Sequence, residues 1–441
     1  MMPGGLRAAG LSTHEGVREI AEPSVLTNSG AYVVTRDLYL LGGSAISVAA
    51  DDVTIDLNGH RVNSVGLFSP YEAAIYQQAG FHQLTVVNGT VVGGSGAGIL
   101  ATGRMNCVKG VNVRDSARGG ILLGDQAVVE NCIVFSNTLG ASYTDLVRVG
   151  QGSRVEAVLV SRNGGTGLVG IRGAKGCRVA DCVIRGNAAA GGFFNGIVLE
   201  AGGVTESVVV RGNSGLSQFV GIGAGRDGAV RHGVVSGNRQ TDGSGTGSGI
   251  NAGENTTVDR CLSRETIAGA YAYGFHHFGQ GRMSQCVAAS NAAATQGFGF
   301  YLRTNVSVSA GAASLNSAVG FLAEDGCVIR QCVAKNNGYT GISLGQWSSA
   351  ERCLVDNTGN NSSDRNGFNA IGSNNRIEFN HASDSGKGFA FFGAGNFVAG
   401  NSAINGVTNY DPFIINSSYG AITNKPGADF ISTNPWQNFG L

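Results

Sequence analysis

VADCVIRGN, residues 179–187, indicates a repeating fold, because close variants of it return along the chain. Similar phrases are VENCIVFSN at 129–137, MSQCVAASN at 283–291 and VIRQCVAKNN at 328–337. Each is a short run of alternating apolar and polar residues that ends at an asparagine, which we call the corner residue. Small residues, a glycine and another short segment follow the corner. The corner recurs about every 24 residues, a period typical of structural repeats. The corner residues are Asn88, Asp115, Asn137, Asn163, Asn187, Asn213, Asn238, Glu265, Asn291, Asn316, Asn337, Asn357, Asn380 and Asn401.

This repeat predicts a solenoid of short strands. Each period carries alternating apolar segments of about three to five residues, which are too short for helices and suit β-strands. Such strands pair with their counterparts one coil on, so the coils stack in parallel. Asparagine tolerates the left-handed backbone of a sharp corner, and its amide can bond to the asparagine of the next coil. The chain has six prolines and none between residues 71 and 411, as uninterrupted ladders require.

The composition agrees with one elongated repeat and excludes several function classes. Glycine contributes 72 residues and apolar residues 42%, which is too apolar for a disordered chain. Thirty basic residues balance thirty acidic ones, so no net field attracts nucleic acid or an anionic membrane surface. No apolar run approaches the roughly 18 residues of a membrane helix, so we expect no membrane insertion.

The first residues leave the compartment open. The stretch MMPGGLRAAGLSTHEGVREI, residues 1–20, lacks the apolar core of a signal peptide. The chain is therefore intracellular or phage-borne, or it is extracellular or at the cell surface after removal of a signal.

Two stretches near the start resemble a known superfamily. SGAYVVTRDLYL at 29–40 and AISVAADDVTIDLNGHRV at 45–62 look like the opening of bacterial right-handed parallel β-helix proteins of the pectate-lyase-like superfamily. NPWQNF at 434–439 resembles a tail of members of that group. The resemblance implies an all-β, single-stranded right-handed parallel β-helix, for which the repeat predicts about 13–15 coils. It leaves the chemistry open, because the superfamily includes lyases, hydrolases, epimerases, phage tailspikes and structural proteins.

The ends of a solenoid need covers, which sets the expected domain organisation. We expect an N-terminal cap over residues 1–30, where STHE at 12–15 has the spacing of a helix capping box. The parallel β-helix is expected over 31–404. A C-terminal cap or tail is expected over 405–441, which holds three of the six prolines.

The nine cysteines follow the repeat. Six of them share one column, four or five residues before a corner: Cys132, Cys182, Cys261, Cys286, Cys332 and Cys353. A column of small apolar residues faces the core, where a thiol packs like a small hydrophobe. We expect buried free thiols, with disulfides as the alternative. No CxxC or Cys/His zinc spacing occurs, so we expect neither a metal nor another cofactor.

The segment after each corner carries the candidate site. Counted from its glycine, the side chains two and four residues on point outward, and successive coils stack these positions into two files. The middle coils gather polar and aromatic groups there. The candidate catalytic residues are His276, Tyr301 and Arg303, and the candidate substrate-binding residues are Glu200, Asn251, Glu324 and Asn369.

Two adjacent histidines pose a specific question. By alternation, His276 points outward into the files, whereas His277 takes the inward position that Leu199 and Leu302 hold elsewhere. A core histidine satisfied by the backbone is favoured for His277. Inserts of eight to eleven residues follow several neighbouring corners between 187 and 291. They would form a wall along one side of the two files, so that the files line a groove.

These residue types suit a linear acidic polysaccharide. Arg303 would neutralise a uronate carboxylate, which acidifies the neighbouring C–H bond, and His276 or Tyr301 would remove or return the proton. That chemistry gives a polysaccharide lyase or, with reprotonation from the other face, a uronate epimerase. YGFHHF at 273–278 faintly resembles a motif of alginate epimerases, but only the first three residues match, so no catalytic role is carried over.

A function without catalysis is the alternative. A neutral, glycine-rich solenoid with polar outward residues also suits a structural protein, an adhesin or a phage-spike-like subunit. Substitutions on the files would then be tolerated, and sensitivity would lie at exposed apolar patches or at the seam of a homotrimer. The residues leave open whether the chain is an enzyme, and we expect a carbohydrate-binding or carbohydrate-processing β-helix with a polysaccharide partner.

Overall fold

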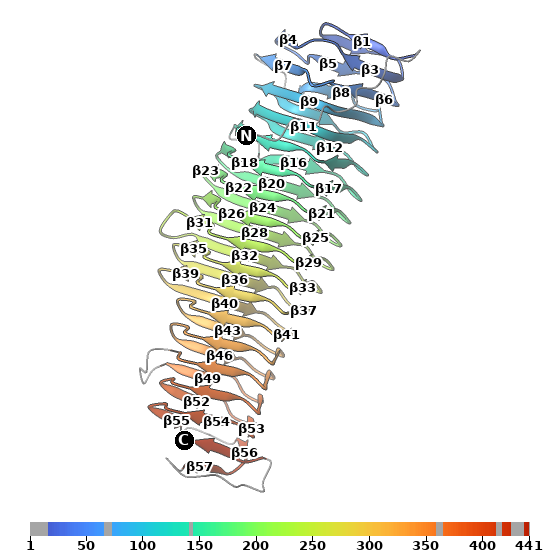
Figure 1. Cartoon of the computed structure of the whole chain (residues 1–441). Coiled ribbons are helices and arrows are strands. Elements are labelled where there is room, and N and C mark those ends of the chain that lie inside the picture. Colours follow the sequence, from blue (N-terminus) through green and yellow to red (C-terminus); the bar gives the residue numbers. More distant parts are fainter. Residues whose placement is uncertain are drawn as a thin grey trace, which may run out of the picture. The chain divides into compact units, whose positions relative to one another are not determined.

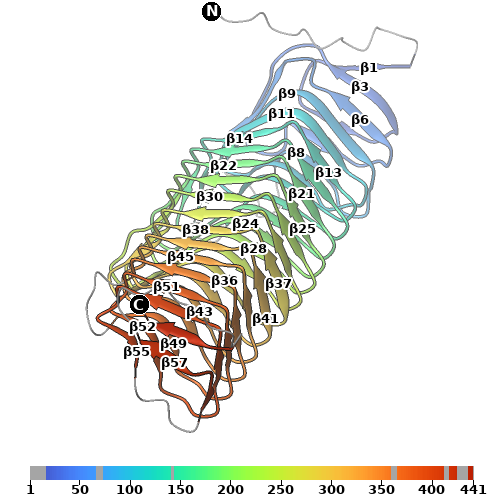
Figure 2. The ribbon, with the colours of Figure 1, turned by 60° about the horizontal axis from the view of Figure 1, so that its bottom comes forward.

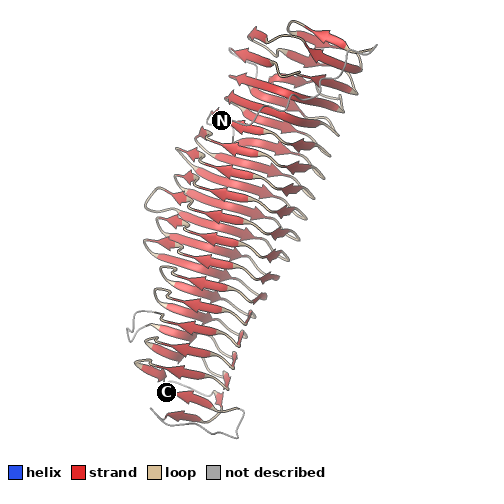
Figure 3. Ribbon diagram, in the orientation of Figure 1, coloured by secondary structure: helices blue, strands red, loops and turns tan. Residues whose placement is uncertain are grey.

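The computed structural model describes residues 16–65, 73–140, 144–358, 365–411, 417–424 and 436–440. The chain forms two compact units: unit 1 is Met1–Val209 with Asn213–Gly215, and unit 2 is Val210–Gly212 with Leu216–Leu441. Each unit is a parallel β-solenoid whose strands pair with those of the next coil (Figure 1), and the coils make about 15 turns. The described residues contain strands and no helix (Figure 3), which confirms the predicted all-β fold class.

Sheet B contains one strand of each coil and carries the candidate site. In unit 1 its strands are β2 (Ser24–Leu26), β5 (Ile46–Val48), β8 (Ala73–Gln77), β10 (Ala97–Ala101), β12 (Gly119–Leu123), β16 (Asp145–Val149), β20 (Leu168–Gly173) and β24 (Phe193–Leu199). In unit 2 they are β28 (Gln218–Ala224), β32 (Thr246–Ala252), β36 (Tyr271–His277), β40 (Gln296–Leu302), β43 (Val319–Ala323), β46 (Thr340–Leu344), β49 (Asn366–Ala370), β52 (Lys387–Phe391) and β55 (Thr408–Tyr410).

Sheet A supplies the other main strands of each coil, which are two in most coils and one long strand at Leu84–Gly94 and at Cys107–Ser116. In unit 1 these are β1 (Arg18–Ile20), β3 (Gly30–Val34), β4 (Leu38–Leu41), β6 (Val53–Asp56), β7 (Arg61–Val65), β9 (Leu84–Gly94), β11 (Cys107–Ser116), β13 (Val128–Glu130), β14 (Ile133–Phe135), β17 (Arg154–Glu156), β18 (Leu159–Ser161), β21 (Arg178–Ala180), β22 (Val183–Arg185) and β25 (Val204–Glu206). Strand β26 (Val209–Arg211) contains residues of both units.

In unit 2 the strands of sheet A are β29 (Ala229–Arg231), β30 (Val234–Ser236), β33 (Thr257–Asp259), β34 (Leu262–Arg264), β37 (Gly281–Ser284), β38 (Val287–Ala289), β41 (Val306–Ser309), β42 (Ala312–Ser314), β44 (Val328–Arg330), β45 (Val333–Lys335), β47 (Ser349–Glu351), β48 (Leu354–Asp356), β50 (Arg376–Glu378), β51 (His381–Ser383), β53 (Phe397–Ala399), β54 (Ser402–Ile404), β56 (Ser418–Tyr419), β57 (Ile422–Asn424) and β58 (Asn438–Gly440). A bend separates the two strands of a coil, so β21 and β22 lie on different faces of unit 1 (Figure 2).

The inserts after several corners form a third, short sheet. Sheet C consists of two-residue strands: β15 (Thr138–Leu139), β19 (Gly164–Gly165), β23 (Ala188–Ala189) and β27 (Ser214–Gly215) in unit 1, and β31 (Arg239–Gln240), β35 (Ile267–Ala268) and β39 (Ala292–Ala293) in unit 2. Ile267 pairs with Arg239 on one side and with Ala292 on the other. The inserts therefore begin as regular extensions of the solenoid.

The asparagine ladder explains the corner of the repeat. In unit 2, Asn291 Nδ2 donates to Oδ1 of Asn316 at 2.9 Å, and Asn316 Nδ2 donates to Oδ1 of Asn337 at 3.0 Å. The same bonds join, in unit 1, Asn137, Asn163, Asn187 and Asn213. All of these side chains are buried, so each amide depends on its neighbours for its hydrogen bonds.

The glycine that follows each corner makes room for this ladder. A Cβ atom on Gly299 would lie 2.8 Å from Asn316 Nδ2 and 2.5 Å from the carbonyl oxygen of Gly320. A Cβ atom on Gly274 would meet Asn291 Nδ2 at 2.7 Å. Asparagine and glycine therefore recur together because the backbone of sheet B passes directly over the ladder.

The left-handed backbone lies one residue earlier than predicted. The φ angle is positive at Ser290 (55°), Leu315 (55°) and Asn336 (55°), and each of these precedes a ladder asparagine. The ladder amide must point into the core to reach its neighbour, so the preceding residue makes the turn and points outward. The prediction that the ladder asparagines themselves take this conformation is wrong.

Three other corner residues belong to the turn position. Asp115 (φ 51°), Glu265 (φ 55°) and Asn357 (φ 45°) have the left-handed backbone themselves. The ladder positions in these coils are one residue later and hold Ser116, Thr266 and Thr358, which are buried. Asn88 (φ 59°) lies inside β9.

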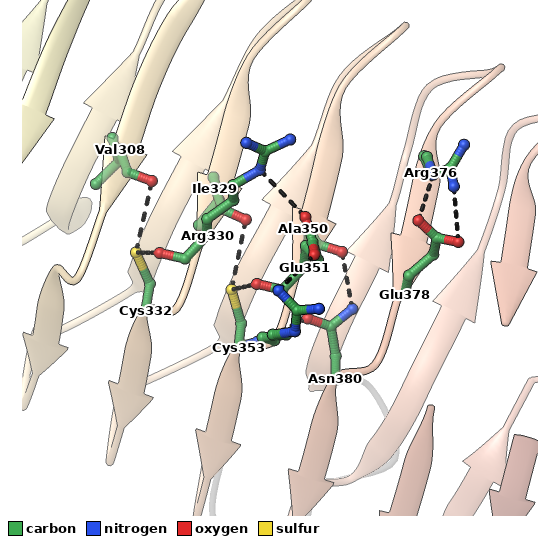
Figure 4. A network of polar contacts seen from close by, with 11 residues as sticks. Val308, Ile329, Arg330, Cys332, Ala350, Glu351, Cys353, Arg376, Glu378 and Asn380 are labelled. Atoms are coloured by element: carbon green, nitrogen blue, oxygen red, sulfur yellow. Dashed lines mark hydrogen bonds and ion pairs between the residues drawn. The ribbon is translucent and has the colours of Figure 1, made fainter. Parts of the chain in front are cut away.

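Asn380 and Asn401 belong to the cysteine column instead of the corner ladder. Leu354 pairs with His381, which places Asn380 beside Cys353, and the Cys353 amide donates to Oδ1 of Asn380 at 2.9 Å. Figure 4 shows Cys332, Cys353 and Asn380 in line on successive strands. From there a second ladder continues, because Asn380 Nδ2 bonds to Asn401 Oδ1 at 3.0 Å. The corner assignment of these two asparagines is therefore corrected.

The prediction for the cysteines is confirmed. All nine thiols are free; eight are buried and Cys107 is half-buried. Each buried thiol bonds weakly to the backbone, as Cys332 Sγ does to the Arg330 carbonyl oxygen at 3.2 Å (Figure 4). Six of the buried thiols occupy one column of small core residues, as the spacing indicated.

Stacked aromatic rings fill the core beneath the candidate site. The ring centroids of Phe275 and Phe300 lie 4.8 Å apart, and those of Phe300 and Phe321 lie 4.5 Å apart. All three side chains are fully buried. Burial of a phenylalanine contributes about 1.5–3 kcal/mol, so this stack holds β36, β40 and β43 in register.

Strands occur within both terminal segments. Inside residues 1–30, β1 pairs with β3 and β2 with β5, in parallel. Inside residues 405–441, β58 pairs with β54. The expected capping helix at 12–15 lies outside the described residues, and the domain boundaries at 30 and 404 stay predictions.

Candidate functional site

Strand register places the middle candidate residues in one file. His276 on β36 pairs with Asn251 on β32 and with Tyr301 on β40. The file continues through Leu322 on β43. Phe275 and His277, on either side of His276, are fully buried, so His276 lies on the outward face as the alternation predicted.

An aromatic cluster surrounds His276. The imidazole centroid lies 4.8 Å from the ring of Tyr301, 5.1 Å from that of Tyr273 and 4.2 Å from that of Phe278. We call the following outward residues of unit 2 the aromatic strip: Asn251, Tyr271, Tyr273, His276, Phe278, Phe298, Tyr301, Arg303 and Glu324. Tyr271 is 38% exposed and Phe278 is 42% exposed, so the strip presents aromatic surface to solvent.

Arg303 is the cation of the aromatic strip. Its guanidinium carbon lies 5.6 Å from the ring centroid of Phe278 and 6.0 Å from that of Tyr301. The side chain is exposed, and no carboxylate of the described chain forms an ion pair with it. Ring contact on one side orients the guanidinium and leaves its N–H groups available for an anion.

Tyr301 and Glu324 are joined by a hydrogen bond. The phenol donates to Glu324 Oε1, and both side chains are partly exposed. Burial raises the pKa of Tyr301 to about 12, and the hydrogen bond to Glu324 adds to this shift. The phenol is therefore protonated at neutral pH and acts as a hydrogen-bond or proton donor.

His276 is neutral at physiological pH. Burial lowers its pKa to about 4, and the positive charge of Arg303 adds to this effect. The side chain is 9% exposed, and its Nε2 atom has no hydrogen-bond partner among the described residues. Nε2 is itself buried, so the imidazole nitrogen is shielded from solvent in this conformation.

His277 is a core residue, as favoured from the sequence. Its Nε2 lies 3.0 Å from the Thr256 carbonyl oxygen, and the Gly279 amide donates to its Nδ1 at 3.3 Å. The first contact requires a hydrogen on Nε2 and the second a lone pair on Nδ1, which defines the neutral tautomer. The backbone therefore satisfies both ring nitrogens.

Of the four candidate substrate-binding residues, two belong to the aromatic strip and two do not. Asn251 and Glu324 join the aromatic strip. Asn369 shares the file of His276 but lies on β49, beyond Leu322 and Ser343. Glu200 follows β24 in unit 1 and is exposed.

Three residues of the aromatic strip, Tyr271, Tyr273 and Phe298, were not predicted from the sequence, because they precede the glycine of their strands. The β-ladder pairs Tyr273 with Phe298 and then Phe275 with Phe300, so it skips Gly274. This irregularity brings Tyr273 and His276, three residues apart, to the same face. The Tyr-x-Tyr alternation before Gly274 is the sequence signal for Tyr271 and Tyr273, and it lies outside the positions that follow the glycine.

Within the described ranges, no group of three or more His, Cys, Asp or Glu residues is placed to hold a metal ion. No helix able to cross a membrane was found in the same residues.

Comparison with known proteins gives structural likeness only. Neither a family model nor a curated protein sequence matches the chain. Similar solved structures include the A-module of mannuronan C-5 epimerase AlgE4 from Azotobacter vinelandii, at 13% identity over 83% of this chain and 90% of that chain, with a TM-score of 0.38. The tailspike protein of E. coli bacteriophage HK620 matches at 12% identity over 82% and 72%, with a TM-score of 0.38. The catalytic domain of a GH87 α-1,3-glucanase matches at 12% identity over 70% and 60%, with a TM-score of 0.31. Likeness at this level assigns no activity to the residues of this chain.

Proposed function

We propose that unit 2 binds an acidic polysaccharide on the aromatic strip. The observation that carries this proposal is the exposed Arg303 guanidinium, which rests on Phe278 and Tyr301 and forms no ion pair with the described residues. A guanidinium forms two parallel hydrogen bonds with a carboxylate. The neighbouring rings offer flat apolar surface to the C–H face of a sugar.

The stacking of the coils suits a polymer. Neighbouring strands of a sheet lie about 4.8 Å apart, so a linear chain laid across β32, β36, β40 and β43 meets a new set of side chains at every step. Asn251 precedes the aromatic residues and Glu324 follows them. An amide and a carboxylate bind sugar hydroxyl groups, which distinguishes the two ends of the strip.

Proton transfer on the bound uronate is a second candidate function. The supporting observation is the neutral imidazole of His276, whose Nε2 is unpartnered in the described structure and lies beside the protonated phenol of Tyr301. Nε2 is buried, so this step requires the rings around His276 to move and expose it. Nε2 would then take the hydrogen next to the carboxylate that Arg303 neutralises, and the electron pair would form a double bond as the glycosidic C–O bond breaks. Tyr301 would protonate the leaving oxygen. Return of a proton to the opposite face of the same carbon would instead give epimerisation.

Binding ranks ahead of catalysis for a physical reason. A base with a pKa of about 4 is weak toward a carbon acid at neutral pH, where general bases work best near the ambient pH. The binding proposal needs no such proton transfer.

The test compares matched variants for polysaccharide binding. Oligogalacturonate, oligoalginate and hyaluronan fragments would be titrated calorimetrically, with carboxyl-reduced fragments as the neutral comparison. Arg303→Gln and Tyr301→Leu should each weaken binding about tenfold, the size of one lost charge-assisted or aromatic contact. Leu322 is the residue that the next coil places in register with Tyr301, so Tyr301→Leu suits the fold. Arg282→Ser serves as the charge control, because it removes an exposed arginine outside the aromatic strip. The new serine matches Ser307, the residue paired with Arg282 in the next coil, so the variant suits the fold.

Other outcomes separate the alternatives. Equal affinity for charged and neutral fragments, or an unchanged affinity in Arg303→Gln, would contradict acidic-polysaccharide binding. A rise in the ultraviolet absorbance of unsaturated uronate that His276→Ala abolishes would establish a lyase, and exchange of the uronate hydrogen with solvent would establish an epimerase. Absence of all binding would favour the structural, adhesin or spike role.

A further inference from the structure

A hollow with unpaired positive charge lies in unit 1, on sheet A. Its volume is about 340 Å³, and it is lined by Asn112, Ile133, Phe135, Ser161, Arg162 and Arg185. None of these residues belongs to the aromatic strip.

The repeat builds the floor and walls of this hollow. Phe135, Ser161 and Arg185 are register partners on β14, β18 and β22. The small Ser161 therefore stands between two large side chains, and it is only 7% exposed. Arg162 occupies the turn position of its coil with φ 56°, so its side chain is carried outward beside this floor.

The two arginines have no carboxylate partner. Arg162 and Arg185 are exposed, and neither forms an ion pair with any residue that the structure describes. Four other arginines of unit 1 are paired with carboxylates: Arg114 with Asp115, Arg154 with Glu156, Arg172 with Asp145 and Arg178 with Glu206. The hollow thus concentrates uncompensated positive charge.

We propose that this hollow binds an oxyanion, a carboxylate or sulfate group, carried on a saccharide ring. Two guanidinium groups supply forked donors, and the Ser161 hydroxyl and the Asn112 amide can donate as well. Phe135 and the 37% exposed Ile133 offer apolar contact to the ring that bears the anion. The proposal concerns residues of unit 1 and does not depend on the function proposed for unit 2.

The experiment uses the full chain and four small probes: inorganic sulfate, glucuronate, glucose 6-sulfate and glucose. Binding would be followed by ligand-detected nuclear magnetic resonance and calorimetry. Arg185→Ser introduces the residue type of Ser161, its register partner in the preceding coil. Arg162→Gly introduces the residue type of Gly186, which has the same left-handed turn position in the next coil. Both variants should fold, which unchanged thermal unfolding would verify.

Each arginine substitution should weaken binding of the charged sugars about tenfold, the loss expected for one charge-assisted hydrogen-bond pair. Glucose should not bind at this hollow. Phe135→Ser should remove the preference for glucose 6-sulfate over inorganic sulfate, because the ring contact is lost. Glucuronate and glucose 6-sulfate separate carboxylate from sulfate as the preferred anion.

Arg282→Ser and Arg303→Gln in unit 2 serve as controls. An equal loss in Arg282→Ser would mean that only net charge matters, and a loss confined to Arg303→Gln would place the anions on the aromatic strip. Either result, or the absence of saturable binding by every anionic probe, would overturn the proposal.

Discussion

The imidazole of His276 and the phenol ring of Tyr301 stack with their centroids 4.8 Å apart, as register partners on β36 and β40. The contact joins a neutral acceptor to a protonated donor within one face of a rigid sheet. Because Phe275 and Phe300 stack directly beneath them, the core of unit 2 holds this pair in place.

Acid should weaken unit 2 through His276. Its pKa is lowered from 6.5 to about 4, so the unfolded chain binds a proton before the folded one does. Stability is then fully present above about pH 6.5 and falls as the pH drops toward 4, by up to about 3 kcal/mol. His276→Asn introduces the residue type that the preceding coil has at the paired position, Asn251. This variant should flatten the slope of stability against pH, measured by denaturant unfolding across this pH range.

His277 provides the comparison for this experiment. Its pKa is also lowered by burial, so part of the slope should remain in His276→Asn. An identical pH dependence in the wild type and in His276→Asn would show that His276 is not desolvated in the folded state.

Removal of the Glu324 charge should make Tyr301 easier to ionise. Glu324 raises the phenol pKa through its hydrogen bond and its charge, while burial is the larger cause. Glu324→Gln should therefore lower the pKa of Tyr301 but leave it above the ordinary value of 10.0. Spectroscopic titration of the phenolate, with Tyr301→Phe to identify its signal, measures the change, and an unchanged titration curve would contradict the hydrogen bond.

Asn316→Ala should be strongly destabilising. The substitution removes the acceptor for Asn291 Nδ2 and the donor to Asn337 Oδ1, and both partners stay buried. Each unsatisfied buried group costs about 1–3 kcal/mol, so we expect a loss of about 2–5 kcal/mol in denaturant unfolding. Asn305→Gly, at an exposed turn with φ 61°, should change the unfolding free energy by less than about 0.5 kcal/mol.

Phe300→Ala should open a cavity in the aromatic stack of unit 2. Loss of a buried phenylalanine typically costs about 3–5 kcal/mol. Phe300→Ile should cost less, about 1.5 kcal/mol or below, because other coils place Ile250 and Ile342 at the same register position. Equal unfolding midpoints for the two variants would show that ring stacking does not hold these strands.

Thiol reagents should find almost no reactive cysteine in the native protein. Burial raises the pKa of Cys132 to about 11 and that of Cys182 to about 12, so thiolate is scarce at neutral pH. Cys107 is half-buried and should react first. Without prior reduction, the denatured chain should release nine thiols, and a smaller number would reveal disulfides.

The repeat, the all-β fold class and the inward column of thiols could be predicted from the amino-acid pattern alone. Those features depend on local rules: alternation places every second side chain in the core, and proline is excluded where ladders continue. The outward position of His276 and the buried position of His277 followed from the same alternation, because it holds wherever the strand is regular.

The alignment of residues between coils could be read only from the folded chain. Asn380 has the spacing of a corner residue, yet the register of β51 places it beside Cys353, because a coil of different length shifts the count. Likewise, Gly274 interrupts the alternation and brings Tyr273 against His276. The hollow at Ser161 depends on side chains from separate coils. Which side chains become neighbours on adjacent coils depends on the lengths of all the turns between them. A short stretch of sequence does not specify those lengths, so it does not specify these neighbours.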